Sequence, residues 1–436
     1  MNAVANWIQS AVQAQPGSGG LPATWLDAVR SQALQRFAAE GWPTTRLEGW
    51  RHTSLATLGT LSFNTVSAPA QGLADRVQAV RGQEQAHWLV FVNGCFVPEL
   101  SAVGTLPQGA TVCTLAHAQA TQPDLVQQLF GHAEQGSAVQ SLNTALATDG
   151  AFIHVRAGVS LEHPVHVLHV ASGEAALNVS RTLFLAETGA RFTLVEQFIG
   201  HESGASLTST VTLGTVQANA QVTHLKLQQE DDQAWHLGAL HVQQEKGSVF
   251  NQHAMSFGAR LARHDITTQF NGDHCETLLN GLYYVNGKRH VDHATRIGHG
   301  KPHGISREYY RGILDDQARG VFTGRILVAP GADKTDAVQR SDSLLLSRMA
   351  RSDARPELEI YADDVKCAHG ATVGQIDPDS LFYLRSRGLD AQSARQVLTY
   401  AFAAEAIERI ESEALRARVI QAIGALAPAG LNGVRA

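Results

Sequence analysis

The feature that most constrains this fold is a long run of short, strand-like segments between residues 151 and 380. Apolar and polar residues alternate in segments such as 152–156, 165–170, 208–213 and 221–227, and glycine or Asn-Gly turns separate them. Alternation with a period of two is typical of strands that bury one face. One sandwich seldom needs this much chain, so the pattern favours a β-solenoid over a sandwich or a barrel, although no fixed sequence repeat is visible.

Helical patterns precede this run. Thr24 can cap an amphipathic helix, because apolar residues recur behind it at helical spacing. The stretch 116–146 is rich in Ala, Gln and Leu, and Pro123 and Gly136 divide it into short helices. A short strand is expected at 87–93. The part of the chain before the long run is therefore predicted to be mainly helical.

A second helical part follows the run. Asp390 can cap a helix that carries an apolar stripe, and a further helix is expected before Pro428. The chain is thus predicted to have an N-terminal mainly helical region (1–150), a β-solenoid core (151–380) and a C-terminal helical region (381–436).

The composition argues for a soluble, globular protein of the cytoplasm. Of 436 residues, 34 are Lys or Arg and 40 are Asp or Glu, so the net charge is −6, and no long block of like charge indicates nucleic acid as the partner. The four cysteines form no C-x-x-C pair, and residues 1–15 lack the features of a secretory signal. No segment reaches the roughly 18 apolar residues that span a membrane. We therefore expect neither nucleic acid nor a membrane as a partner.

The usual catalytic and nucleotide-binding motifs are absent. A Walker A loop needs Ser or Thr after Gly-Lys, and here Pro302 follows Lys301. There is no Gly-x-Ser-x-Gly elbow, and the pairs at 315–316 and 363–364 are interpreted as turn formers because adjacent Asp residues are common in turns. Any step that uses ATP would therefore need a site on a partner.

Histidine is abundant, at 20 residues, and a series lies between His290 and His303. Positions 290 and 293 of one strand point to opposite faces because side chains alternate along a strand. The same argument separates His166 from His163 and His169. We interpret the histidines between His290 and His303 as surface or loop histidines, and neither series as one set of metal ligands.

The most informative stretch is 358–372, with the sequence LEIYADDVKCAHGAT. Leu358, Ile360 and Ala362 alternate as one face that we expect to be buried, and the Asp pair that follows permits a turn or a bulge.

After this turn, Cys367 and His369 share one face of a strand because they are two residues apart. A thiolate beside an imidazole is half of a site for iron or an iron-sulfur cluster, but two ligands do not complete a tetrahedral coordination. Two interpretations remain open from the residues alone. Either the pair is a buried cysteine with a hydrogen-bonded histidine, or it is a site that another chain completes.

Several further segments can be read together with this stretch. They extend over most of the chain and are densest between 300 and 400: RLEGWRHTSL (46–55), GRILV (324–328), KTDA (334–337), SDSLLLS (341–347), LEIYADDVKCAHGATVGQID (358–377) and LFYLRSRGL (381–389). Together they closely resemble the SufD subunit family of the SUF iron-sulfur cluster assembly scaffold.

The resemblance implies a mainly β fold, with a right-handed parallel β-helix, a β-solenoid, between N-terminal and C-terminal helical regions. It implies a non-catalytic scaffold subunit that pairs with a SufB-type homologue and docks a SufC-type ABC ATPase, which agrees with the absent Walker A loop. ATP-driven dimerisation of the ATPase would reshape the interface of the two scaffold subunits. A homodimer of the isolated chain is also plausible.

The resemblance also suggests site residues. SufB-type chains carry a cysteine near the position of Gln339 and Arg340, and an acidic residue in place of Gly370, so this chain is similar to the D-type. In that family the histidine that matches His369 is implicated in cluster assembly, with Cys367 beside it. The chain would hold only part of a transient iron or iron-sulfur cluster site, and no permanent cofactor.

The part of the family that meets the ATPase matches the C-terminal region of this chain. The residues expected there are Tyr383, Arg385, Arg387 and Gly388, placed just before the predicted helix, and Val397 and Phe402 on its apolar stripe.

Two other classes of protein compete with this interpretation. A β-solenoid polysaccharide lyase or hydrolase would normally be secreted, and a histidine-rich metal-binding protein would act alone. Whether iron enters through this chain, and whether a flavin takes part, stays open.

Overall fold

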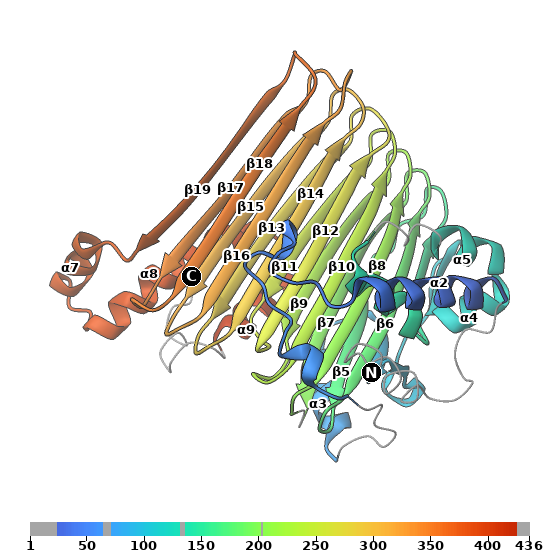
Figure 1. Cartoon of the computed structure of the whole chain (residues 1–436), viewed down its shortest axis with the longest axis horizontal. Coiled ribbons are helices and arrows are strands. Elements are labelled where there is room, and N and C mark those ends of the chain that lie inside the picture. The colour runs from blue at the N-terminus through green and yellow to red at the C-terminus, as the bar shows by residue number, and fades with distance from the viewer. Residues whose placement is uncertain (1–23, 64–70, 131–135, 202–203, 425–436) are drawn as a thin grey trace.

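The computed structural model describes residues 24–63, 71–130, 136–201 and 204–424. Figure 1 shows a β-solenoid of about eight turns, with helices beside its N-terminal end and further helices along its C-terminal half. The mainly β fold with helical parts before and after the solenoid is as predicted. The short strand expected at 87–93 is also present.

Two sheets form the walls of the solenoid. The first has ten strands in the spatial order β19 (Lys366–Gln375), β17 (Asp336–Leu345), β15 (Ile305–Leu314), β13 (Glu276–Val285), β11 (Val249–Ser256), β9 (Gln221–Gln229), β7 (Arg191–His201), β5 (Val165–Ser172), β1 (His87–Val92) and β2 (Cys95–Phe96). The second has nine strands in the order β18 (Arg351–Ile360), β16 (Arg319–Val328), β14 (His290–His299), β12 (Leu261–Phe270), β10 (Trp235–Gln244), β8 (Leu207–Val216), β6 (Leu177–Ala186), β4 (Gly150–Val155) and β3 (Ala110–Thr114).

Consecutive turns of the solenoid stack in register. From β4 to β19 the neighbouring strands of each sheet are parallel, so one residue of each turn lies above one residue of the next. Side chains alternate between the lumen and the outer surface, which explains the period of two in the sequence. Such columns place residues about thirty positions apart in direct contact, at the strand spacing of about 4.8 Å.

Helices and short 3-10 turns complete the chain. The described ones are α2 (Thr24–Glu40), η1 (Glu48–Trp50), η2 (Leu58–Thr60), α3 (Leu73–Arg81), η3 (Pro98–Leu100), α4 (Leu115–Thr121), α5 (Pro123–Phe130), α6 (Ala138–Leu146), α7 (Pro378–Ser386), α8 (Ala391–Ile407) and α9 (Glu413–Gly424). The breaks expected at Pro123 and Gly136 are confirmed, and Asp390 caps α8 by accepting hydrogen bonds from the N–H groups of Gln392 and Ser393.

The solenoid lumen is apolar in most places but contains a buried polar cluster. Glu196 accepts hydrogen bonds from Thr182 and Thr212, at 2.7 and 2.8 Å, and from His224 Nε2 at 2.9 Å. Burial alone would raise the pKa of Glu196, but the charged or polar groups around it outweigh this effect and lower the pKa to about 2. Lys226 lies in the same cluster, and burial lowers its pKa to about 8.

An N-terminal segment crosses the outer face of the second sheet. Thr53 is fully buried and donates a hydrogen bond to Asp292, and the guanidinium of Arg263 lies between Asp292 and the Trp50 ring, 3.9 Å from its centroid. These contacts hold the RLEGWRHTSL segment (46–55), one of the segments that carry the family resemblance, against the solenoid. Its role here is therefore to cover a sheet face.

The C-terminal helices cover part of the first sheet. α8 and α9 pack through Ala403, Ile407 and Val419 on apolar residues of β7 to β15. Asn280 of β13 donates a hydrogen bond to the Ala406 carbonyl at 2.8 Å. In the described parts of the chain, no helix is both long and apolar enough to cross a membrane.

Candidate metal and partner-binding site

The solenoid is open at its C-terminal end. In the part of the chain that the structure describes, β18 and β19 are the last strands of their sheets and each has a neighbouring strand on one side only; Figure 1 shows β19 as the outermost strand. Large apolar side chains are exposed at this end: Met349, Ile360, Tyr361 and Val373. Ile360, which we expected on a buried face, is 40% exposed because no further turn of the described chain covers it. A long apolar edge of this kind is typical of a surface that pairs with another chain.

The backbone of this last turn makes β19 more suitable than β18 for such pairing. The N–H of Tyr361 points to β16, so the backbone N–H and C=O groups of the even-numbered residues of β18 point away from the sheet. Pro356 is one of these and lacks an N–H, which interrupts the outward row of donors. The N–H of Lys366 points toward β17, so the odd-numbered residues of β19, including Cys367 and His369, present N–H and C=O outward.

The side chains of Cys367 and His369 face the lumen side of the last turn. Their partners on β17 are Ala337 and Gln339, and both partners are buried. Cys367 is half-buried and packs against the lumen core, whereas His369 is exposed. In the described parts of the chain no hydrogen bond involves the His369 ring. The interpretation of this pair as a buried cysteine with a hydrogen-bonded histidine therefore does not fit.

This pair is an incomplete set of ligands. Burial raises the pKa of the Cys367 thiol, so the thiol has to lose a proton when a metal binds. Among the described residues no group of three or more His, Cys, Asp or Glu side chains is arranged to hold a metal ion. A metal or cluster at Cys367 and His369 needs further ligands from elsewhere.

The histidines between 290 and 303 do not form a set of metal ligands. His290 and His293 lie on opposite faces of β14, as predicted, and His290 Nε2 lies 2.9 Å from Thr53 Oγ1 on the outer face. The expectation that all were surface or loop residues is wrong for His293 and His299, which are fully buried. Burial lowers their pKa values to about 3 and about 4. Both therefore stay uncharged in the core at neutral pH.

The short helix α7 was not predicted and carries the first expected ATPase contacts. Asp377 caps it and Pro378 occupies its first turn, a signal that the sequence contained. Tyr383 is 56% exposed, Arg385 is also exposed, and the Arg387 guanidinium lies 5.2 Å from the Tyr383 ring centroid.

The neighbouring residues of α7 add one surface group and one backbone requirement. Phe382, which sequence reasoning missed, is 72% exposed. Gly388 ends this region with a φ of 98°, so it is required by the backbone rather than as a surface contact.

The apolar stripe of α8 contacts the solenoid of the same chain. The Phe402 ring packs beneath the Arg311 guanidinium, which lies 4.5 Å from the ring centroid. Val397 is half-buried on the same helix. Phe402 therefore already has an intramolecular partner, and the exposed residues of α7 are better placed to meet another protein.

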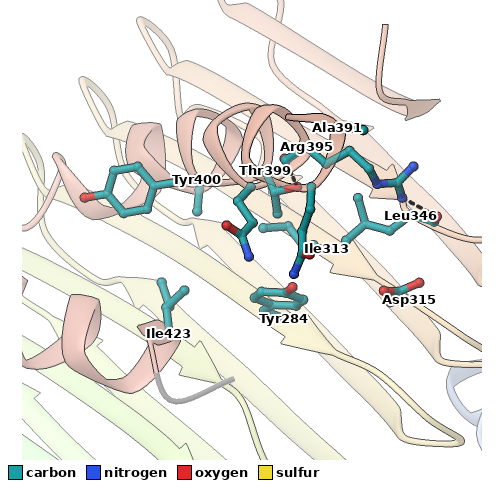
Figure 2. Close-up of a pocket in the computed structure, with 12 residues that line it drawn as sticks. Tyr284, Ile313, Asp315, Leu346, Ala391, Arg395, Thr399, Tyr400 and Ile423 are labelled. Carbon is teal, nitrogen blue, oxygen red and sulfur yellow. Dashed lines mark hydrogen bonds between the residues drawn. The ribbon is translucent and has the colours of Figure 1, made fainter. Parts of the chain in front are cut away.

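A cavity of about 320 Å³ lies between α8 and the first sheet, as Figure 2 shows. Tyr284 and Ile313 of the solenoid line it below, and Thr399 and Tyr400 of α8 line it above. Arg395 donates to the Leu346 carbonyl at 3.0 Å across one end. None of the residues that line this cavity belongs to β18 or β19, so it is separate from the cysteine and histidine pair.

A chain of polar contacts joins α8 to β19. Arg311 of β15 donates to the Phe402 carbonyl at 3.0 Å and pairs with Glu405. Its Nη2 lies 3.7 Å from Asp342 Oδ2 of β17, and Asp342 Oδ1 accepts a hydrogen bond from Thr372 of β19 at 2.5 Å. Sequence reasoning missed this connection, although Asp342 lies within the SDSLLLS segment.

Comparisons with known proteins give a consistent result. Residues 169–402 match a family model described as "SUF system FeS cluster assembly, SufBD core domain", and residues 21–167 match "SufBD protein N-terminal region". The chain is 35% identical over 410 residues to the iron-sulfur cluster assembly protein SufD of Escherichia coli (strain K12), which covers 92% of each chain.

Two further relatives extend the similarity. An iron-sulfur cluster assembly SufBD family protein of Synechocystis is 32% identical over 395 residues, covering 87% of this chain and 86% of the relative. The iron-sulfur cluster assembly protein SufD of Bacillus subtilis is 27% identical over 424 residues, covering 92% of this chain and 93% of the relative.

Proposed function

Because the chain belongs to the SufBD family of the SUF iron-sulfur cluster assembly system, we propose that it is a D-type scaffold subunit that builds a nascent cluster at an interface with a SufB-type homologue. His369 is the iron or cluster ligand that it contributes, and Cys367 is a secondary ligand. The observation that carries this proposal is the position of both side chains at the uncovered end of the solenoid.

The open edge supports pairing with a homologue. A SufB-type solenoid would present a similar last turn, and pairing through β19 would satisfy its outward N–H and C=O groups. It would also cover apolar side chains such as Ile360 and Val373. A second copy of this chain can offer the same edge, so a homodimer is expected to compete when the homologue is absent.

Pairing would also complete the ligand set. Imidazole nitrogen and thiolate sulfur are both ligands that iron and iron-sulfur clusters accept. The two that this chain supplies lie at the lumen side of the last turn, next to where the partner's last turn would be. The partner must supply the remaining ligands, since no third His, Cys, Asp or Glu among the described residues joins this pair.

The C-terminal helices support docking of a SufC-type ATPase. Phe382 and Tyr383 give α7 an exposed apolar surface, flanked by Arg385 and Arg387. The contacts from α8 through Arg311 to β19 would carry a displacement of the docked helices to the strand that holds His369. ATP binding by the partner would then change the population of an open interface.

The ligand role is tested by cluster reconstitution. The chain is co-expressed with SufB-type and SufC-type partners, and the complex is isolated without oxygen and supplied with iron and sulfide. We expect iron-sulfur absorbance in the wild type and in the control His303→Ala, which changes an exposed turn histidine. We expect its loss in His369→Ala, with the complex intact. Equal absorbance in all three would refute the assignment.

The docking role needs point substitutions rather than a deletion. Removing everything after Leu389 would also expose the sheet face that α8 and α9 cover, so loss of the ATPase would be ambiguous. Tyr383→Ala with Arg387→Ala changes only exposed side chains of α7. We expect this double variant to lose co-purification of the ATPase while it retains the homologue. Undiminished recovery of the ATPase would contradict the docking surface.

A further inference from the structure

The lumen beneath His369 contains a column of mostly polar side chains that no ligand assignment uses. In the register of the first sheet, Gln252, Leu279, Glu308, Gln339 and His369 lie one above another on β11, β13, β15, β17 and β19. All but His369 are buried. The column therefore leads from the closed interior to the open end.

Gln339 is the register partner of His369 on the neighbouring strand β17. Its Nε2 donates a hydrogen bond to Glu308 Oε2 at 2.6 Å, while its Oε1 is buried and has no hydrogen-bond partner among the described residues. An unpaired buried acceptor costs roughly 1–3 kcal/mol, so a donor that can reach it is stabilising. The next residue of the column is His369, whose ring carries an N–H. The backbones of the two residues lie on neighbouring strands, one strand spacing of about 4.8 Å apart.

The orientation of the Gln339 amide is determined by its surroundings. At pH 8, above its pKa of about 7, Glu308 is mainly a carboxylate and only accepts hydrogen bonds. The NH₂ group of Gln339 then faces Glu308, and the carbonyl oxygen is directed elsewhere. Across the lumen, Gly324 makes room for this amide, because a Cβ at that position would lie 2.4 Å from Gln339 Nε2. A larger residue at 324 would displace the side chain.

From this geometry we propose that Gln339 is a positioning residue for His369: its orphan carbonyl oxygen accepts the N–H of one ring nitrogen and leaves the other nitrogen free to bind metal, while Glu308 holds the Gln339 amide in the required orientation. This inference rests on the proposed ligand role of His369. Histidine ligands commonly donate their second N–H to such an acceptor, and losing it typically weakens metal affinity 10-fold to 100-fold.

The test measures Co²⁺ binding to the complex with the SufB-type homologue at pH 8. Binding is monitored by the visible absorption of the bound ion. Gln339→Met keeps the volume and removes both polar groups. Glu308→Leu leaves the amide without its acceptor, whereas Glu308→Gln retains one. We expect Gln339→Met and Glu308→Leu to weaken Co²⁺ binding 10-fold to 100-fold. We expect Glu308→Gln to bind Co²⁺ with an affinity within about threefold of wild type.

Gln252→Met is the matched control. Gln252 is a fully buried glutamine of the same column, four strand spacings or about 19 Å from His369, and its side chain has no hydrogen-bond partner in the described structure. We expect this variant to bind Co²⁺ as the wild type does. A general loss of lumen order would weaken binding in Gln252→Met and Gln339→Met alike, and that result would overturn the positioning role.

His369→Ala separates the two proposals. If His369→Ala abolishes Co²⁺ binding and Gln339→Met leaves it unchanged, the ligand role stands and the positioning role is refuted. If His369→Ala binds Co²⁺ like the wild type, the ligand assignment itself fails.

Discussion

Glu308 gives the sharpest prediction about stability. It is fully buried in the lumen, and one of its carboxylate oxygens has no hydrogen-bond partner within the described ranges of the chain. Burial raises its pKa from 4.5 to about 7, and the interactions with the side chains of Thr295 and Gln339 only partly oppose this shift. Replacing Glu308 by Gln keeps the size of the side chain and removes the titration.

The sign and the magnitude follow from linkage. Between about pH 4.5 and pH 7 the folded protein holds a proton that the unfolded chain has released, so the free energy of unfolding falls as the pH rises through this window. The raised pKa of a group this buried corresponds to a total loss of roughly 3 kcal/mol for the wild type. Glu308→Gln lacks this loss, so its stability relative to wild type should increase by about that amount between pH 4.5 and 8.

The assay is amide hydrogen exchange of β15 and β17 at several pH values, corrected for intrinsic exchange, because it reports the local opening free energy beside the substitution. Glu196→Gln is the control of opposite sign. The pKa of Glu196 is lowered to about 2, so its carboxylate stabilises the fold at neutral pH and its replacement should destabilise it there. Parallel pH profiles for wild type and Glu308→Gln would refute the reasoning.

Two further substitutions test how the parts of the chain are held together. Arg311→Ala removes the contacts to the Phe402 carbonyl, Glu405 and Asp342, and we expect a cost of roughly 3 kcal/mol, measured as faster hydrogen exchange in α8; unchanged exchange would show that the ion pairs do not hold the helix. Thr53→Val removes the hydroxyl that donates to buried Asp292 and should cost about 1–3 kcal/mol in urea unfolding, whereas Thr57→Val at an exposed position should have almost no effect.

The architecture was accessible from the sequence because local patterns specify it. Period-two alternation predicted the strands, Pro123 predicted a break between helices, and Asp390 predicted a helix cap. Each prediction uses a physical preference of one or a few neighbouring residues. The helix α7 was not predicted, although Asp377 is a favourable N-cap and Pro378 is favourable in a first helical turn. The segment that follows was interpreted only from its family resemblance.

The geometry of the site could not be obtained in the same way. That Cys367 and His369 share a face follows from their spacing, but their exposure depends on which turn of the solenoid is last. The contact of Glu308 with Gln339 joins residues 31 positions apart, and it exists only because the turns stack in one register. The sequence has no visible repeat, so that register could not be read from it.

The most direct test of the central claim is to identify the ligand on the cluster itself. The chain is labelled with ¹⁵N at histidine, combined with unlabelled SufB-type and SufC-type partners, reconstituted with iron and sulfide, reduced, and studied by pulsed electron paramagnetic resonance. The proposed site predicts a ¹⁵N hyperfine coupling from this chain that disappears in His369→Ala. A cluster that forms at full yield without any histidine nitrogen coupling from this chain would contradict the proposal.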